Sequence, residues 1–224
     1  MTERTPTQRE SHKADPRGVQ ARALAALRAA DPVLGGLIDD HPTLDPWEWR
    51  ARWPREPFAL LVRTITGQQI STSAADAIFG RVRELLGAEF TPAGLARRSD
   101  EELRGAGLSR AKLASLRDLS ARVLAGSLTI DRLADLPDDE LRRRLPAVRG
   151  IGPWTVELLL IGLARPDALP AADVGLRRAV RDVYGLDHLP NGPEVAALGE
   201  RWRPYRSLAA AYLYASLRRS ASLD

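Results

Sequence analysis

The stretch that decides the fold is "LPAVRGIGPWTVELLLIGLARPDALPAADVGLRRAV", residues 145–180. Two helical patterns flank the turn "VRGIG", and Pro153 suits the first position of the second helix. Gly150 and Gly152 allow the backbone to adopt positive φ and to approach a bulky partner closely. The amides that begin the following helix are unpaired, so the turn is typical of an anion site whose natural occupant is a backbone phosphate. An ordinary tight helical hairpin is the alternative interpretation of the turn taken alone.

Two further residues of this stretch have expected places. Ile151, between the glycines, should point inward and fill the space between the two helices. Asp173 follows Pro170 and precedes an apolar pattern at helical spacing, which fits a helix N-cap. A carboxylate at this position could also act as a catalyst, and the two roles are compatible.

The composition limits the classes of protein. A chain of 224 residues with 44% hydrophobic residues can bury the core of one domain or of two closely packed halves. No stretch approaches the roughly 20 apolar residues of a membrane span, and the charged N-terminus lacks a signal core, so we expect a soluble protein of the cytoplasm. The absence of cysteine excludes disulfides, thiolate zinc sites and cysteine-ligated iron–sulfur clusters, and no metal site is expected.

The charge favours a nucleic-acid partner, although only weakly. The formal net charge is +4, and lysine occurs only at Lys13 and Lys112, so almost all basic residues are arginines. Arginine suits bidentate phosphate contacts. An arginine-rich coding bias would give the same excess, so the charge alone does not identify the partner.

The hydrophobic periodicity predicts an all-α fold, because nearly every periodic segment has helical spacing and none alternates convincingly as a strand would. Residues 1–16 are polar and predict a disordered tail. The helical domain should therefore occupy residues 17–224. We expect two halves within it, at roughly 55–126 and 127–216, with the N-terminal helices completing the fold.

The first predicted half begins with two helices separated by a glycine break. One helix should run from Pro57 to about Thr66, break at Gly67 and resume from Ser71, where Ser71 or Thr72 can cap it. The segment before Pro57 is irregular. We expect its three tryptophans to anchor it to the core: Trp47, Trp49 and Trp53.

Four segments of the chain carry a resemblance to a known superfamily. "LPAVRGIGPWTVELLL" resembles the helix-hairpin-helix element of the DNA glycosylase superfamily, and "LPAADVGLRRAV" supplies the downstream aspartate of that family as Asp173. "LVRTITGQQISTSAADAI" resembles its DNA-penetrating segment, and "RWRPYRSLAAAYLYAS" its closing helix. The four segments occur in order over about residues 55–216. The resemblance implies a DNA glycosylase of base excision repair, with two helical halves that flank a DNA-binding cleft.

The hairpin and the last helix indicate which branch of that superfamily the chain resembles. Branches that also cleave the strand place a lysine at the start of the second hairpin helix to form a Schiff base, whereas this chain has Trp154 there. The chain resembles 3-methyladenine DNA glycosylase II, the alkylation-repair branch, which shares the tryptophan. It also shares the "W-x-P-x-R-S" start of the last helix, here Trp202, Pro204, Arg206 and Ser207.

This branch implies a compact monofunctional enzyme. We expect hydrolysis of the N-glycosidic bond without AP-lyase activity, on double-stranded DNA that contains damaged bases, by a monomer. The best-known members of this branch also carry an extra N-terminal α/β subdomain. The roughly 55 residues that precede the matched region here do not have strand patterns, so no such subdomain is expected.

The chemistry of the branch assigns a role to Asp173. A purine alkylated on a ring nitrogen, such as 3-methyladenine, is already a good leaving group. The enzyme must then stabilise an oxocarbenium-like sugar and orient water, which a preorganised carboxylate can do. The target base must also be flipped out of the stack.

A flipped cationic base suits a pocket with aromatic walls, because cation–π attraction holds a desolvated cation. By position, Trp154 and Tyr214 are the expected rings, with simple core packing as the alternative for each. Leu158 stands where this branch has a tyrosine, which leaves the substrate range open.

The DNA contacts should come from the hairpin and from the "GQQ" turn. Gln69 stands where a leucine can act as the wedge, and glutamine can fill the space left by a flipped base. Gln68 should brace the loop. The hairpin residues expected at the DNA are Gly150, Ile151, Gly152 and Thr155. No cofactor is expected, and a monovalent cation on the carbonyls near Val148 and Ile151 stays open.

Two other functions remain open at the level of the sequence. A non-enzymatic helix-hairpin-helix DNA-binding module would keep Gly150 and Gly152 but would not need Asp173. A glycosylase for neutral oxidised or mismatched bases should need more hydrogen bonding in its pocket.

Overall fold

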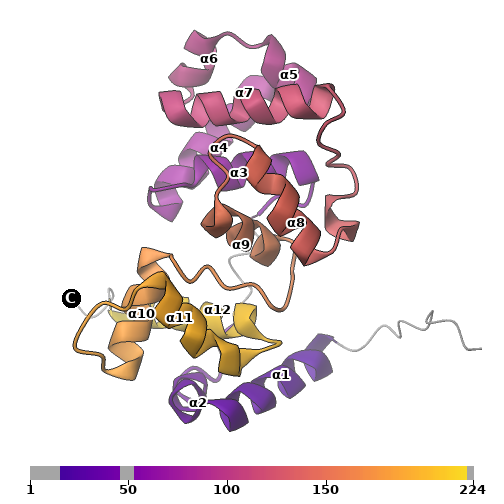
Figure 1. Cartoon of the computed structure of the whole chain (residues 1–224). Coiled ribbons are helices and arrows are strands. Elements are labelled where there is room, and N and C mark those ends of the chain that lie inside the picture. Colours follow the sequence, from indigo (N-terminus) through magenta and orange to yellow (C-terminus); the bar gives the residue numbers. More distant parts are fainter. Residues whose placement is uncertain (1–15, 46–52, 221–224) are drawn as a thin grey trace, which may run out of the picture.

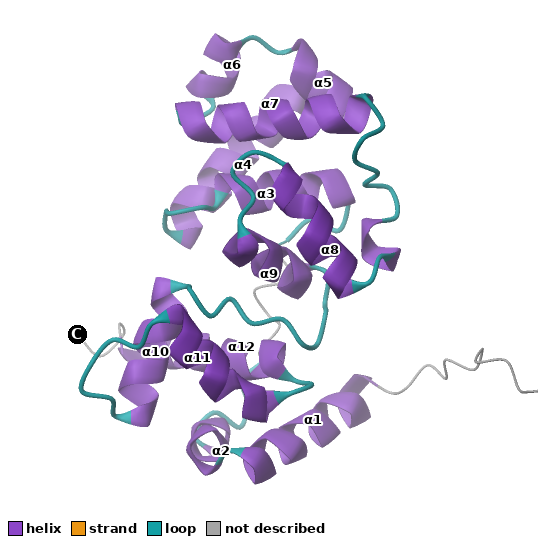
Figure 2. Cartoon of the chain, viewed as in Figure 1, coloured by secondary structure: helices purple, strands orange, loops and turns teal. Residues whose placement is uncertain are grey.

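The computed structural model describes residues 16–45 and 53–220, and this described part is helical without a strand (Figure 2). The all-α prediction is therefore confirmed. The expected tail, residues 1–16, lies outside the described residues apart from Pro16. The α-helices in chain order are α1 Pro16–Ala30, α2 Pro32–Asp39, α3 Pro57–Thr66, α4 Thr72–Leu86, α5 Pro92–Arg97, α6 Asp100–Gly105, α7 Arg110–Leu124, α8 Asp138–Arg144, α9 Pro153–Gly162, α10 Val174–Tyr184, α11 Gly192–Gly199 and α12 Arg206–Ser220.

The helices form two halves with separate cores (Figure 1). One core is built by buried residues between Phe58 and Ala168, which lie on α3 to α9 and their connections. The other combines α1 and α2 with the chain from Leu169 onward, on α10, α11 and α12. The halves expected at 55–126 and 127–216 are therefore wrong at their boundary, which falls between Ala168 and Leu169.

The physical reason for this correction is the packing of the hairpin helices. Leu141 of α8 and Val156, Leu159 and Leu160 of α9 are at most 1% exposed and belong to the first core. The helix α9 packs against α3. Since the hairpin buries its apolar face there, the chain crosses to the second half only after α9 ends.

A buried carboxylate connects the N-terminal helices to the rest of the second half. Asp31 caps α2 by accepting from the amides of Val33 and Leu34, and its Oδ2 also accepts from Tyr184 Oη (2.6 Å) and Trp202 Nε1 (2.8 Å). Burial by itself would raise the pKa of Asp31, but the hydrogen bonds from these donors outweigh it and lower the pKa below 3.8. The prediction that the N-terminal helices complete the fold is consistent with this contact.

The break at Gly67, between α3 and α4, lies where the sequence predicts it. The helix α3 begins at Pro57 and ends at Thr66, and Ser71 caps α4 by accepting from the Ala74 amide. Trp53 packs against the first core, as expected, and lies under the Arg63 guanidinium at 5.5 Å. Two of the predicted anchors, Trp47 and Trp49, lie outside the described residues.

None of the helices within residues 16–45 and 53–220 combines the length and the apolar character that a membrane crossing requires.

Candidate active site

A cleft of about 670 Å³ opens where the α3–α4 turn, the hairpin turn and the start of α10 meet. Its lining comes from all three segments: Gly67, Gln68, Gln69, Ile70, Ser71, Gly150, Gly152, Pro153, Trp154, Thr155, Ala172, Asp173 and Val174. Two of these are exposed apolar residues that the sequence reasoning missed, Ile70 at 38% and Val174 at 48% exposure. Their positions beside Gln69 and Asp173 were the available signal, because exposed apolar groups around polar side chains are typical of ligand sites.

The carboxylate of Asp173 lies at the boundary between the halves and is held by both. Its Oδ1 accepts from the Leu176 amide (2.9 Å), which makes it the N-cap of α10 as predicted. Its Oδ2 accepts from the indole Nε1 of Trp154 (3.0 Å), which belongs to α9. The cap therefore uses one oxygen, and the other is oriented by a side chain of the first half.

Tyr214 lies beside Asp173 and is not one of the residues that line the cleft. Its ring lies close to Gly175 in the first turn of α10. Burial, and then the charge of Asp173, raise the pKa of Tyr214 well above its ordinary value. Tyr214 is thus a neutral phenol beside the carboxylate.

Only one of the three expected pocket residues lines the cleft. Trp154 does so and is half-buried. Leu158, one turn further along α9, is half-buried but does not line the cleft, and neither does Tyr214. Of the two expected aromatic rings, only the indole of Trp154 therefore lines the cleft.

The hairpin turn is fastened to α7. Gly150 has φ +76°, and a Cβ at this position would collide with Ser115 Oγ of α7. One turn along α7, Asp118 Oδ2 accepts from the Arg149 amide (2.8 Å). The hydrogen bonds from this amide and from Arg122 lower the pKa of Asp118. The sequence reasoning missed Ser115 and Asp118, because nothing in α7 itself indicates what packs on it.

The two hairpin glycines have different roles. Gly150 has the expected positive φ, whereas Gly152 has φ −97° and ψ 177°, so the prediction of positive φ is wrong for Gly152. A Cβ at Gly152 would meet nothing within 4 Å inside the protein. Gly150 is therefore required by the fold, while Gly152 leaves open space at the N-terminus of α9. Ile151 is 4% exposed and fills the core between the helices, as predicted.

The "GQQ" turn is braced against the hairpin. The Gln68 amide donates from Nε2 to the Gly150 carbonyl (2.8 Å) and to Thr155 Oγ1 (2.9 Å), so the brace predicted for Gln68 is confirmed. Thr155, one of the residues that line the cleft, is 4% exposed and its hydroxyl accepts this bond. Gln69 is exposed with φ +58°, a conformation that few non-glycine residues adopt. The brace thus holds the outward-facing Gln69 in a strained backbone.

Two basic side chains support the α3–α4 turn from within the protein. Lys112 Nζ of α7 donates to the Thr66 carbonyl (2.8 Å) at the end of α3, and burial lowers its pKa. Arg63 is 4% exposed, pairs with Asp76 of α4 (2.6 Å) and lies against Gly67. The sequence did not predict that either residue contacts this turn, since a lone lysine or arginine in a helix gives no signal of its partner.

Comparison with known proteins agrees with this arrangement. Residues 62–204 match the HhH-GPD superfamily of base excision DNA repair proteins. A relative from Schizosaccharomyces pombe, DNA-3-methyladenine glycosylase 1, is 34% identical over 169 residues, which cover 74% of this chain and 74% of the relative.

Two solved structures are similar over most of the chain. The S. pombe 3-methyladenine DNA glycosylase in complex with abasic DNA is 30% identical, with a TM-score of 0.79, covering 86% of this chain and 95% of that one. A DNA-3-methyladenine glycosidase from Bacillus halodurans is 32% identical, with a TM-score of 0.72, covering 93% and 92%. Because the match includes the turn, the hairpin and the aspartate in one cleft, this chain belongs to the HhH-GPD superfamily of base excision DNA repair proteins.

Proposed function

We propose that this protein is a monofunctional DNA glycosylase that removes alkylated, positively charged purines such as 3-methyladenine from double-stranded DNA. The observation that carries the proposal is the position of Asp173, whose carboxylate lines a cleft between the hairpin and the α3–α4 turn. The two similar structures and the S. pombe relative, all named for 3-methyladenine, support this class of substrate.

In the proposed mechanism Asp173 acts on charge and not on the leaving base. A purine methylated on N3 departs as a neutral base, so the glycosidic bond breaks without a general acid. The positive charge that develops on the sugar is stabilised by the nearby carboxylate, which the bonds from Trp154 and Leu176 have already oriented. A water from the cleft then adds its oxygen to C1′ of the sugar and releases a proton to the solvent, which completes the hydrolysis and leaves an abasic site.

The DNA contacts follow from the backbone of the hairpin. The first amides of α9 are unpaired, and Gly152 has open space beside them, so a backbone phosphate can approach closely. Gln69, exposed at the tip of the opposite turn, is the proposed wedge that occupies the space of the flipped base. Trp154 is the proposed ring against which the cationic base lies.

The absence of a lyase step is proposed from the positions of the amines. Trp154 occupies the position where a Schiff-base lysine would begin the second hairpin helix. Lys112 is directed at the Thr66 carbonyl, a hydrogen bond that uses its ammonium group to brace the α3–α4 turn. Strand cleavage through a covalent imine would need a free amine in the cleft.

The decisive experiment is mass spectrometry of the bases released from methylated DNA. We expect the wild-type protein to release 3-methyladenine and the Asp173→Asn variant to release none above background. Release of neutral oxidised or deaminated bases alone would contradict the proposed substrate. Binding of the duplex with no release of any base would favour a DNA-binding module.

A further inference from the structure

The helix α9 contacts the crossing segment, residues 167–173 between the two halves, at two points. Trp154, in its first turn, donates to Asp173 Oδ2 (3.0 Å). Glu157, one turn later, accepts from the Leu169 amide through Oε2 (2.9 Å). The contacts are four residues apart on the crossing segment and three apart on α9, so together they determine how this segment lies along the helix.

The Glu157 carboxylate is itself oriented by Arg142 of α8. Arg142 donates from Nε to Oε1 (2.7 Å) and from Nη2 to Oε2 (3.3 Å), and this hydrogen bonding raises the pKa of the guanidinium. The Glu157 side chain is only 17% exposed, so water screens the pair weakly. Arg142 has a second partner in Asp139 (3.2 Å), whose side chain is 90% exposed.

The chain between Leu169 and Asp173 is a closed turn. The Ala171 amide donates to the Leu169 carbonyl (2.8 Å), and the Asp173 amide donates to the Pro170 carbonyl (2.8 Å). These two bonds remove most of the freedom of four residues. A displacement of Leu169 is therefore transmitted to the Asp173 backbone and is not absorbed by the turn.

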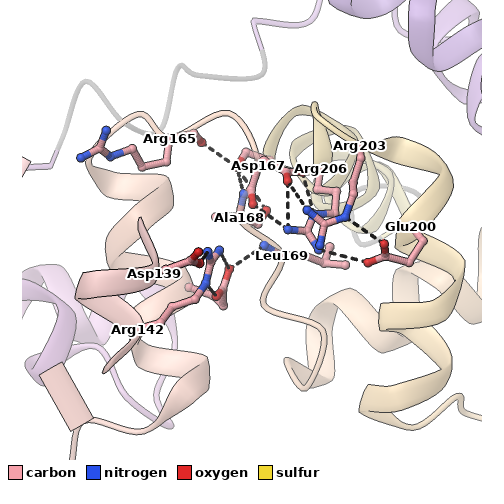
Figure 3. Close-up of polar contacts among 11 residues, drawn as sticks. Asp139, Arg142, Arg165, Asp167, Ala168, Leu169, Glu200, Arg203 and Arg206 are labelled. Atoms are coloured by element: carbon pink, nitrogen blue, oxygen red, sulfur yellow. Dashed lines mark hydrogen bonds and ion pairs between the residues drawn. The ribbon is translucent and has the colours of Figure 1, made fainter. Parts of the chain in front are cut away.

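The second half holds the same crossing segment from the other side (Figure 3). Arg206, which is 9% exposed, pairs through Nε with Asp167 (2.7 Å), and Arg203 reaches the same carboxylate (2.6 Å). Ser207 Oγ accepts from the Ala168 amide (2.9 Å). Residues of α12 thus hold this segment at the Asp167 carboxylate and the Ala168 amide, and Glu157 of α9 holds it at the Leu169 amide, while the Ala168 side chain packs in the first core and the Leu169 side chain in the second.

We propose that Glu157, oriented by Arg142, is a positioning residue for the Asp173 carboxylate, an inference that rests on the proposed function. Glu157 does not touch the cleft, so it acts only through Leu169 and the closed turn. Without it the second half would retain Asp173 as the cap of α10, but the distance from the carboxylate to Trp154 and to the sugar would no longer be set. Misplacement of about 1 Å can lower a rate about 100-fold.

The test compares Glu157→Ala with Asp139→Ala, which removes the other partner of the same arginine. We expect Glu157→Ala to lower the single-turnover excision rate by about tenfold or more while affinity for an abasic-analogue duplex stays within about twofold. Asp139→Ala should change neither. Glu157→Gln keeps an oxygen for the Leu169 amide and should recover most of the rate.

A signal that needs no substrate separates positioning from a loss of stability. The indole N–H resonance of Trp154, assigned with Trp154→Phe, should move in Glu157→Ala toward its position in Asp173→Ala, and should stay in place in Asp139→Ala. If Glu157→Ala does not fold, Glu157→Asp takes its place, because the shorter side chain keeps the charge but withdraws from Leu169.

Equal rates and equal Trp154 resonances in the Glu157 and Asp139 variants would overturn the proposal. Excision retained by Asp173→Asn would instead contradict the proposed function. The Trp154 resonance would still report whether Glu157 positions the carboxylate.

Discussion

The indole of Trp154 donates to the Asp173 carboxylate across 3.0 Å, so a side chain of one half directly orients the proposed catalyst that begins a helix in the other. The bond spans nineteen positions of the chain and lies in the cleft. The bond uses the indole N–H of Trp154, which stacking against a base would not require. The relative placement of the halves and the geometry of the site are therefore coupled.

Replacing Asp173 by asparagine should abolish excision and leave the fold intact. Asparagine can still cap α10 through its oxygen, so the free energy of unfolding should change by less than about 1 kcal/mol. The lost charge should lower single-turnover excision more than about 100-fold, in the range seen when one electrostatic stabiliser is removed. Affinity for an abasic-analogue duplex should remain near the wild-type value. Excision within tenfold of wild type would refute the catalytic assignment.

Trp154→Phe separates the hydrogen bond from the ring. Phenylalanine keeps an aromatic face toward the cleft but has no donor for Asp173. We expect excision to fall about tenfold, which corresponds to the loss of one hydrogen bond to a charged group. Single-turnover kinetics on a 3-methyladenine duplex measure this, with thermal unfolding as the control for folding. An unchanged rate would mean that the indole bond does not contribute to positioning.

The two hairpin glycines should respond differently to alanine. Gly150→Ala places a Cβ at positive φ against Ser115, so we expect it to destabilise the protein by about 1–2 kcal/mol or more. Gly152→Ala has room within the protein and should leave the unfolding curve unchanged.

The expected defect of Gly152→Ala is in DNA binding. The added methyl group occupies the space beside the α9 amides, so affinity should fall by a similar factor for undamaged and abasic-analogue duplexes, because phosphate contacts do not read bases. Fluorescence anisotropy with both duplexes measures this. Wild-type affinity of the folded variant would mean that the hairpin is only a tight turn and does not hold a phosphate.

Borohydride should trap no covalent complex between this protein and DNA that contains an alkylated base. The strand should remain intact until alkali cleaves the abasic site. Trp154 cannot form an imine, and the Lys112 ammonium group is hydrogen-bonded to the Thr66 carbonyl. Denaturing electrophoresis with and without borohydride measures both products. A trapped adduct that disappears in Lys112→Ala would show that this lysine leaves its brace and reaches the sugar.

Asp31 should make the stability of the second half dependent on acid pH. Removing its carboxylate in Asp31→Ala leaves the buried donors of Tyr184 and Trp202 unpaired and should cost about 3 kcal/mol at neutral pH. Because the folded-state pKa is lowered, the carboxylate stabilises the fold above about pH 3.8 and loses this effect as the pH falls through the lowered pKa. Denaturant unfolding of both proteins at pH 6 and at pH 3 should show the difference shrinking. A difference that grows in acid would reverse the assigned direction of the shift.

The local structure could be predicted from the sequence because its signals act within one or two helical turns. Pro57 and Ser71 determine where α3 and α4 begin, and Asp173 caps α10 through an amide three residues away. Ile151 is buried as its place between the glycines suggested. The bracing role of Gln68 was predicted only from its position beside Gln69, the proposed wedge. The two acceptors of its amide, the Gly150 carbonyl and Thr155 Oγ1, were not predicted.

The tertiary structure decided which distant residues meet. The boundary between the halves moved to Ala168 and Leu169 because α8 and α9 bury their apolar faces in the first core. The bond from Trp154 to Asp173, the contact from Glu157 to Leu169 and the fit of Gly150 on Ser115 depend on that packing. Periodicity, caps and glycines specify which face of a helix is buried and where it ends. Only tertiary packing, within one core and between the two, brings residues twelve to thirty-five positions apart into contact.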